Sequence, residues 1–265
     1  MNKWALWCCF LLFLSSCGAK NNQSVNRQEE KPKETAVDEK AQQIVDAAIE
    51  EHGGSKYEDS RVTFYFRDRH YIATRGERKF QYERIFTDSS GAEIRDVLTH
   101  EGFYREKDGK RVVLSEKDSS AYANSVNSVI YFALLPYFLN DAAVIKQYLG
   151  EATIKGAPYQ KVKVTFRQDG GGEDFEDEYL YWFHKDNHTL DYLAYNFKVN
   201  GGGARFREAY STRTSNGIRF ANYRNYKPKD DNRNVAEFDD LFENGGLELL
   251  SLIELKEVRV VLDYW

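Results

Sequence analysis

The sequence predicts an α+β fold, in which an antiparallel sheet of about eleven strands carries an N-terminal helix and a central helical insertion. Three observations lead to this prediction. Apolar residues recur at every second position over residues 61–114 and again over residues 161–262, which is the period of a half-buried strand. Helical intervals of three and four occur before the first of these blocks and between the two. Helices and strands that are segregated in this way favour α+β over alternating α/β.

The N-terminus has the features of a secretory signal peptide, because Lys3 precedes the apolar residues 4–14. The ending Leu14-Ser15-Ser16-Cys17 resembles the lipobox of bacterial lipoproteins, which implies removal of residues 1–16 and acyl chains on Cys17. Two alternatives are an uncleaved anchor helix, for which eleven apolar residues are too few, and ordinary cleavage near Ala19.

Lipidation would make the membrane a partner of the protein. Gly18 follows the cysteine in place of the aspartate that retains lipoproteins in the inner membrane. The same resemblance therefore implies attachment to the outer membrane, facing the periplasm. Residues 17–34 contain the cysteine and a polar stretch that we interpret as a flexible tether, which leaves residues 35–265 as a single domain.

The amino-acid composition limits the classes of function that this protein can have. Cys8 and Cys9 leave with the signal peptide, so the domain has no disulfide and depends on its own core. The net charge is −5 and the basic residues are scattered, so we expect no nucleic-acid partner. Aromatic residues make up 15% of the chain, which suits strands with one wet face and equally suits a surface that stacks on sugars.

The first helix is predicted after Thr35-Ala-Val-Asp38, which has the spacing of a capping box. It should end at Gly53-Gly54, because glycine takes a left-handed cap at little cost. The apolar positions lie on one helical face: Ala41, Ile44, Val45, Ala48 and Ile49.

The strand blocks are divided by turn signals. In the first block Asp108-Gly109 is a two-residue hairpin signal, and in the second Asp186-Asn187 and Asn216-Gly217 have the same role. Residues 227–234 are interpreted as a polar loop, and residues 249–262 as one last long strand.

The central insertion, residues 119–149, contains the most apolar stretch after the N-terminus, the eleven uncharged residues 129–139. Pro136 pushes Leu135 out of the helical region, so one helix is predicted to end near Leu134. A second helix over residues 142–149, capped by Asn140 or Asp141, is predicted to follow.

An N-terminal helix, a run of antiparallel strands, a helical insertion and a hairpin over residues 179–193 resemble the LolA/LolB-like superfamily of lipoprotein-localisation carriers. The apolar segment at residues 132–139 resembles a segment of such proteins, and the resemblance covers about residues 39–262. It implies a strongly curved, incomplete barrel with helices in its open side and a cavity that takes acyl chains. No individual ligand contact is transferred from the named carriers.

The predicted function is therefore binding of a lipid or acyl chain in a cavity between sheet and helices. The candidate ligand-binding residues surround the proline or lie on an alternating strand: Tyr131, Phe132, Leu135, Phe138, Leu139 and Trp182. The insertion can equally be core that packs helix against sheet. The alternative function is a glycan- or protein-binding lipoprotein that uses exposed aromatic residues and has no lipid cavity.

No catalytic, metal or cofactor site is predicted. His184 and His188 flank a turn, where residues four apart do not share a face, and the acidic residues 169–178 lack the order of a calcium loop. Hydrolase motifs are absent from the sequence, and Asp239 and Asp240 are expected to be exposed. The sequence therefore predicts a protein that is not an enzyme.

Overall fold

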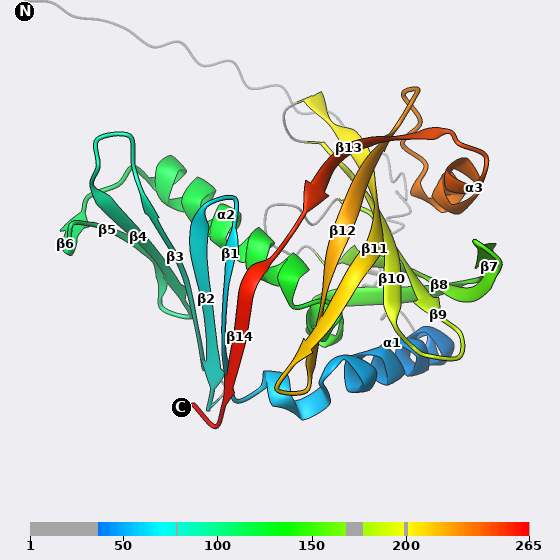
Figure 1. Cartoon of the computed structure of the whole chain (residues 1–265), viewed down its shortest axis with the longest axis horizontal. Coiled ribbons are helices and arrows are strands. Elements are labelled where there is room, and N and C mark those ends of the chain that lie inside the picture. Colours follow the sequence, from blue (N-terminus) through cyan, green and yellow to red (C-terminus); the bar gives the residue numbers. More distant parts are fainter. Residues whose placement is uncertain (1–36, 78, 168–176, 199–200, 265) are drawn as a thin grey trace, which may run out of the picture. The chain divides into compact units, whose positions relative to one another are not determined.

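The computed structural model describes residues 37–77, 79–167, 177–198 and 201–264. In this part of the chain fourteen strands form two antiparallel sheets of seven, with three α-helices (Figure 1). Thr35, Cys17 and the segments predicted to be a signal peptide and a tether lie outside the described residues. None of the helices in the described ranges is long and apolar enough to cross a bilayer.

The first sheet contains every strand that precedes α2, together with the last strand of the chain. In order across the sheet it consists of β14 (Lys256–Leu262), β1 (Ser60–Phe66), β2 (Arg69–Gly76), β3 (Lys79–Thr87), β4 (Glu93–Thr99), β5 (Gly102–Lys107) and β6 (Lys110–Val112). The hairpin predicted at Asp108-Gly109 is confirmed, because Lys107 pairs with Lys110.

The second sheet contains the strands that follow α2. In order across the sheet it consists of β13 (Leu247–Ile253), β12 (Ile218–Pro228), β11 (Gly203–Ser215), β10 (Leu190–Phe197), β9 (Tyr179–His184), β8 (Ala157–Phe166) and β7 (Val144–Ile154). The turns predicted at Asp186-Asn187 and Asn216-Gly217 are confirmed by the β9–β10 and β11–β12 pairings.

The prediction of an α+β fold, with antiparallel strands that do not close into a barrel and helices beside them, is confirmed; the strands number fourteen in two sheets where about eleven were expected. The predicted last strand is two strands, separated by Glu254 and Leu255, and each half lies at the edge of a different sheet. Side chains bridge this break: Leu255 N donates to Asn222 Oδ1 at 3.0 Å, and Asn216 Nδ2 donates to Val260 O at 2.7 Å.

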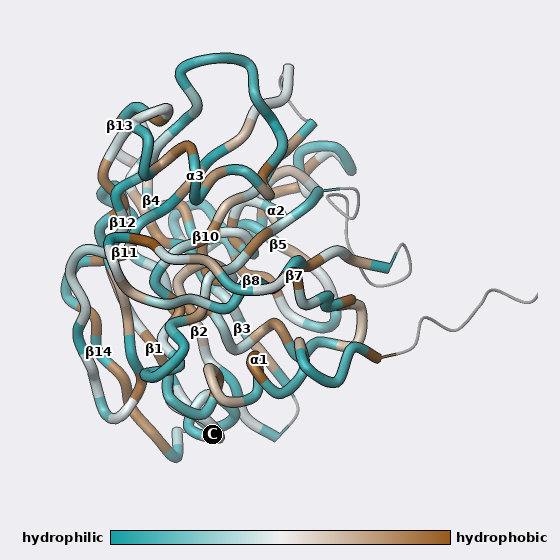
Figure 2. Tube along the Cα trace, turned by 90° about the vertical axis from the view of Figure 1, so that its right-hand side faces the viewer, coloured by the Kyte–Doolittle hydropathy of each residue, from teal (hydrophilic) through white to brown (hydrophobic). Residues whose placement is uncertain are grey.

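α1 (Glu39–His52) ends where the sequence predicts, and it begins after Asp38, the last residue of the predicted capping box. The Asp38 carboxylate accepts from Ala41 N at 3.0 Å and also from Tyr148 N at 2.8 Å, so the cap ties the helix to β7. Gly53 ends the helix with φ of 149°. Hydrophobic positions recur between hydrophilic ones along α1 (Figure 2), and the apolar face packs on the second sheet. The short helix η1 (Gly54–Tyr57) then leads into β1.

α2 (Glu116–Ala133) crosses from one sheet to the other (Figure 1). It packs on the first sheet through Val126 and Ile130, and it ends at Leu134 as the proline predicts. The second predicted helix, 142–149, is wrong. The chain forms only the short helix η2 (Tyr137–Asn140) and then β7, because the backbone of residues 144–154 pairs with β8.

The predicted polar loop leads into helices that the sequence reading missed: η4 (Val235–Glu237) and α3 (Phe238–Glu243). They pack on the face of the second sheet opposite to α1, through Val235 and Phe238. A six-residue helix has too few turns to show a periodic pattern, which explains why it was missed.

Candidate ligand-binding site

A cavity of about 560 Å³ lies at the break between the two sheets. Its walls come from the end of β1, the last turns of α2 and strands β10–β13. The lining residues are Phe66, Arg67, Ser128, Val129, Phe132, Ala133, Tyr195, Arg205, Arg207, Ala221, Tyr223, Asn225, Leu250, Ser251, Ile253 and Leu255. Ser128 and Leu250 are exposed, so the cavity opens to solvent.

The helical wall of the cavity is apolar because of helix periodicity. Val129, Phe132 and Ala133 are three and four residues apart, so they share the face of α2 that turns toward the second sheet. The Phe132 ring lies 5.4 Å from the Tyr195 ring of β10. On the sheet side, burial raises the pKa of Tyr223 to about 12, so its hydroxyl stays neutral.

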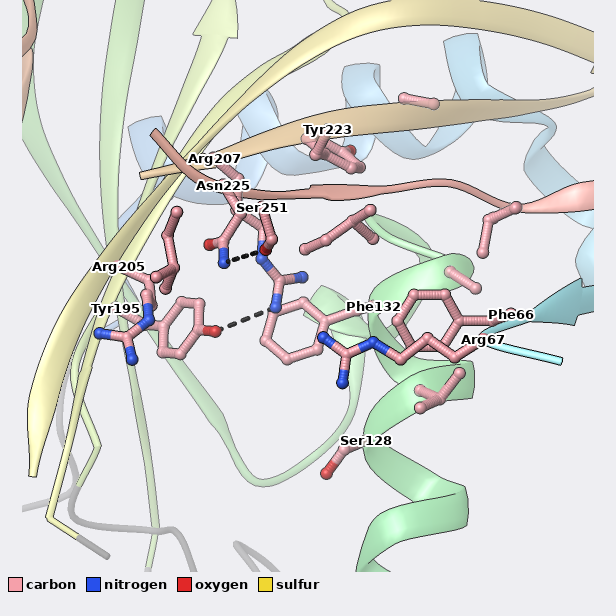
Figure 3. Close-up of a pocket in the computed structure, with 16 residues that line it drawn as sticks. Phe66, Arg67, Ser128, Phe132, Tyr195, Arg205, Arg207, Tyr223, Asn225 and Ser251 are labelled. Atoms are coloured by element: carbon pink, nitrogen blue, oxygen red, sulfur yellow. Dashed lines mark hydrogen bonds between the residues drawn. The ribbon is translucent and has the colours of Figure 1, made fainter. Parts of the chain in front are cut away.

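Arg207 on β11 is the most buried cation of the cavity, with 9% of its surface exposed. Its Nη2 donates to Tyr195 Oη at 2.9 Å, and its guanidinium lies 4.0 Å from the centre of the Phe132 ring (Figure 3). Nε is buried without a hydrogen-bond acceptor. Among the described residues no carboxylate lies within ion-pair distance of this guanidinium.

Asn225 on β12 is directly opposite Arg207 in the strand register. Its Nδ2 donates to Ser251 Oγ on β13 at 3.1 Å, and its Oδ1 is buried without a partner (Figure 3). The floor of the cavity therefore contains two side chains with unsatisfied polar atoms.

Two further arginines line the cavity. Arg67 belongs to the two-residue β1–β2 turn, where it has φ of 48°, and its side chain extends toward the cavity (Figure 3). Arg205 donates from Nη1 to Ala204 O at 2.8 Å and lies 5.0 Å from the centre of the Phe197 ring. Within the part of the chain that the structure describes, no Asp or Glu lines this cavity.

The six residues expected to bind ligand do not lie together in the structure. Phe132 lines the main cavity. Tyr131 and Phe138 line a second cavity of about 390 Å³, in which burial raises the pKa of Asp141. Burial also raises the pKa of Tyr131.

Leu135 and Leu139 are buried core residues that pack with the apolar face of α1, and neither lines the two cavities described above. For these two leucines the structure shows the core role that was the alternative interpretation of the insertion.

Trp182 does not lie with the other candidates. It is on the face of β9 that packs under α3, fully buried, and its Nε1 donates to Asp239 Oδ2 at 3.3 Å. Strand alternation explains this, since its neighbours Tyr181 and Phe183 face α1. The expectation that Asp239 is exposed is wrong, because it is buried and also accepts from Lys161 Nζ at 3.1 Å.

The sequence analysis gave no role to Arg205 and Arg207. Both lie on a strand, where they alternate with Ala204 and Phe206. Alternation gives the face of a residue but does not tell whether that face meets solvent or a cavity.

The histidine pair has a structural role in a turn. His184 Nδ1 accepts from the backbone N–H groups of Asp186 and Asn187, both at 3.2 Å. His188 takes the left-handed conformation there, with φ of 56°. Of the acidic segment 169–178, residues 169–176 lie outside the described residues.

Comparison with known proteins gives a family. Residues 3–255 match the family described as "Family of unknown function (DUF6503)". The chain belongs to this family. Among curated proteins none matches the sequence significantly.

The chain is similar in fold to solved structures of the LolA superfamily. A domain named for outer-membrane lipoprotein sorting, from Vibrio parahaemolyticus, has a TM-score of 0.45 at 9% identity, covering 85% of this chain and 93% of that one. A LolA superfamily protein of Nitrosomonas europaea has a TM-score of 0.45 at 11% identity, covering 83% and 92%. A DUF1329 family protein of Desulfovibrio piger has a TM-score of 0.40 at 12% identity, covering 84% and 93%. Likeness at this level says nothing of a ligand, so a function has to come from the cavity itself.

Proposed function

We propose that this protein is a membrane-anchored lipoprotein that binds a hydrophobic ligand, a lipid or an acyl chain, in the cavity between α2 and strands β10–β13. The observation that supports this proposal is the cavity of about 560 Å³, in which apolar side chains of α2 face strands that supply both apolar and polar side chains. Small-molecule sites in proteins typically measure about 300–1,000 Å³.

The affinity should depend on chain length. Each methylene group moved from water into an apolar site contributes about 0.8 kcal/mol, which is roughly a fourfold gain in affinity. We expect affinity to rise with acyl length until the chain fills the space between Val129 and Ile253, and then to stop rising.

The test uses the full chain with Cys17→Ala, so that no acyl chain of its own occupies the cavity. Native mass spectrometry should detect co-purified lipid, and an environment-sensitive fluorescent probe should be displaced by fatty acids. Ser128→Trp places a bulky side chain at the mouth of the cavity and should lower probe binding at least tenfold.

Ala121→Trp is the matched control, because Ala121 is an exposed position of α2 that lines neither cavity described above. Equal binding by both tryptophan variants, or a protein that takes up neither probe nor lipid, would refute the cavity as a ligand site.

The anchor is proposed from Leu14-Ser15-Ser16-Cys17 and Gly18. Cys17→Ala should move the protein from the outer-membrane fraction to the soluble fraction of a bacterial host. A variant that still partitions into detergent would show that lipidation of this cysteine is not what attaches the protein to the membrane.

The alternative, a glycan- or protein-binding surface, requires tyrosine or tryptophan on an outer face. Among the described residues, the exposed aromatic side chains are Tyr65 and Tyr264. Tyr65 stacks on His70 at 4.8 Å, and the Arg61 guanidinium lies 5.1 Å from the centre of the Tyr264 ring. The cavity is therefore the better supported site. We also propose that the protein is not an enzyme, since its sequence has no catalytic motif.

A further inference from the structure

The two buried arginines of the described chain differ in how their charge is compensated. Arg84, 2% exposed, donates from Nε at 2.9 Å and from Nη2 at 2.5 Å to Asp96 Oδ2. Arg207 has a similar degree of burial but contacts only an aromatic hydroxyl and two aromatic rings. A buried charge without a counter-charge is costly, because water no longer solvates it and nothing in the protein replaces that water.

The cavity has a positive charge that the rest of the chain does not share. Arg67, Arg205 and Arg207 line it, and no carboxylate is among the described residues of its lining, although the whole chain has a net charge of −5. All three guanidinium groups lie against aromatic rings instead of acids, Arg67 against Phe66 at 5.2 Å. A cation held by a ring face keeps its full charge, so its field remains available to an anion in the cavity.

The neighbouring polar group suits the same ligand. Asn225 faces Arg207 across the β11–β12 register and has one amide atom without a partner. A half turn of its amide would let Oδ1 accept from the Ser251 hydroxyl and leave the NH₂ group as a second donor toward the cavity.

We infer that the ligand of this cavity is an anionic amphiphile, whose carboxylate or phosphate group is bound by Arg207 with the help of Asn225, while its apolar chain lies along α2. This inference rests on the proposed function. Guanidinium binds both kinds of anion through paired hydrogen bonds, so the side chain alone accepts either.

The test uses three ligands with the same chain and different headgroups: hexadecanoate, monohexadecyl phosphate and hexadecanol. Each competes with an uncharged fluorescent probe for the full chain with Cys17→Ala. We expect at least one of the anions to bind ten- to a hundredfold more tightly than hexadecanol, which is the range expected for a charge-assisted hydrogen bond. The order of the two anions identifies the headgroup as carboxylate or phosphate.

Arg207→Met should abolish this preference and leave the affinity for hexadecanol within threefold of that of the parent chain. Arg205→Met is the matched control, because it removes one charge from the same cavity but leaves Arg207 in place. It should keep most of the preference, and thermal unfolding should show that both variants are folded. If Arg207→Met does not fold, the comparison of headgroups in the parent chain alone decides whether the cavity prefers an anionic ligand.

Equal binding of anions and hexadecanol to the parent chain would overturn the headgroup inference and leave the proposed function intact. A preference that survives in Arg207→Met, or that Arg205→Met loses equally, would overturn the assignment to Arg207. If none of the three ligands binds, both the inference and the proposed function are overturned.

Discussion

His52 at the end of α1 makes the stability of the protein dependent on pH in a predictable direction. Its imidazole is buried, and its Nε2 accepts a hydrogen bond from Leu190 N at 3.1 Å, which requires a neutral ring. Burial, together with the nearby Arg219 guanidinium, lowers the pKa of His52 to about 3. In the unfolded chain the pKa returns to about 6.5.

The sign and size follow from proton linkage. Below pH 6.5 the unfolded chain binds a proton at His52 that the folded chain does not bind, so the free energy of unfolding falls as the pH falls. Between pH 7.5 and 5.0 this one group should lower the free energy of unfolding by about 2 kcal/mol. The loss would continue down to the folded pKa of about 3.

The assay is urea unfolding of the parent chain and of His52→Gln at pH 7.5 and 5.0. The glutamine carbonyl can still accept from Leu190 N but does not titrate, so the difference between the two pH values should shrink by about 2 kcal/mol. His100→Gln is the control for the substitution itself, since that histidine side chain is 51% exposed. Identical pH dependence in the parent chain and His52→Gln would refute the claim that folding holds this imidazole neutral.

Three other predictions concern stability. Asp96→Ala removes the carboxylate that accepts from Arg84 and from Arg105 Nε at 2.6 Å. It should lower the free energy of unfolding by about 3–5 kcal/mol, or Tm by roughly 6–20 °C, as measured by calorimetry. An equal loss in Asp96→Ala alone and in the double variant Arg84→Met/Asp96→Leu would contradict this prediction. Leu135→Glu should destabilise the fold by a few kcal/mol in denaturant titration, because Leu135 is 4% exposed in the core; near-parent stability would show that the site is wetter than its burial indicates. Chelator should leave Tm unchanged to within a few degrees, and a larger shift would reveal a bound metal.

Local sequence signals predicted the elements well where one residue determines the backbone. Gly53 ends α1, Pro136 follows the end of α2, and Asn216-Gly217 turns a hairpin, because each acts through its own conformational preference. The β1–β2 turn was less visible, since Arg67-Asp68 takes the left-handed conformation without a glycine.

Long-range features could not be predicted in the same way. Apolar alternation assigned residues 249–262 to a strand but gave no sign of a break at Glu254 and Leu255, where the chain passes between sheets. Likewise Trp182 and Phe132 are both aromatic residues in apolar surroundings, and only tertiary packing places one under α3 and the other in the cavity. Arg207 was missed for the same reason, because its significance lies in the absence of an acidic neighbour from other strands.

The break between β13 and β14 determines which interactions hold the two sheets together. In a closed barrel, backbone hydrogen bonds continue around the whole circumference. Here, within the described residues, no strand pairing joins the two sheets at this edge, and side chains such as Asn222 bridge them instead. Ile218 and Phe220 of β12 also pack in one apolar cluster with Val62 and Val260 of the first sheet. The cavity therefore lies at a seam that is held by side-chain contacts, so substitutions there can change its shape without removing a backbone hydrogen bond from either sheet.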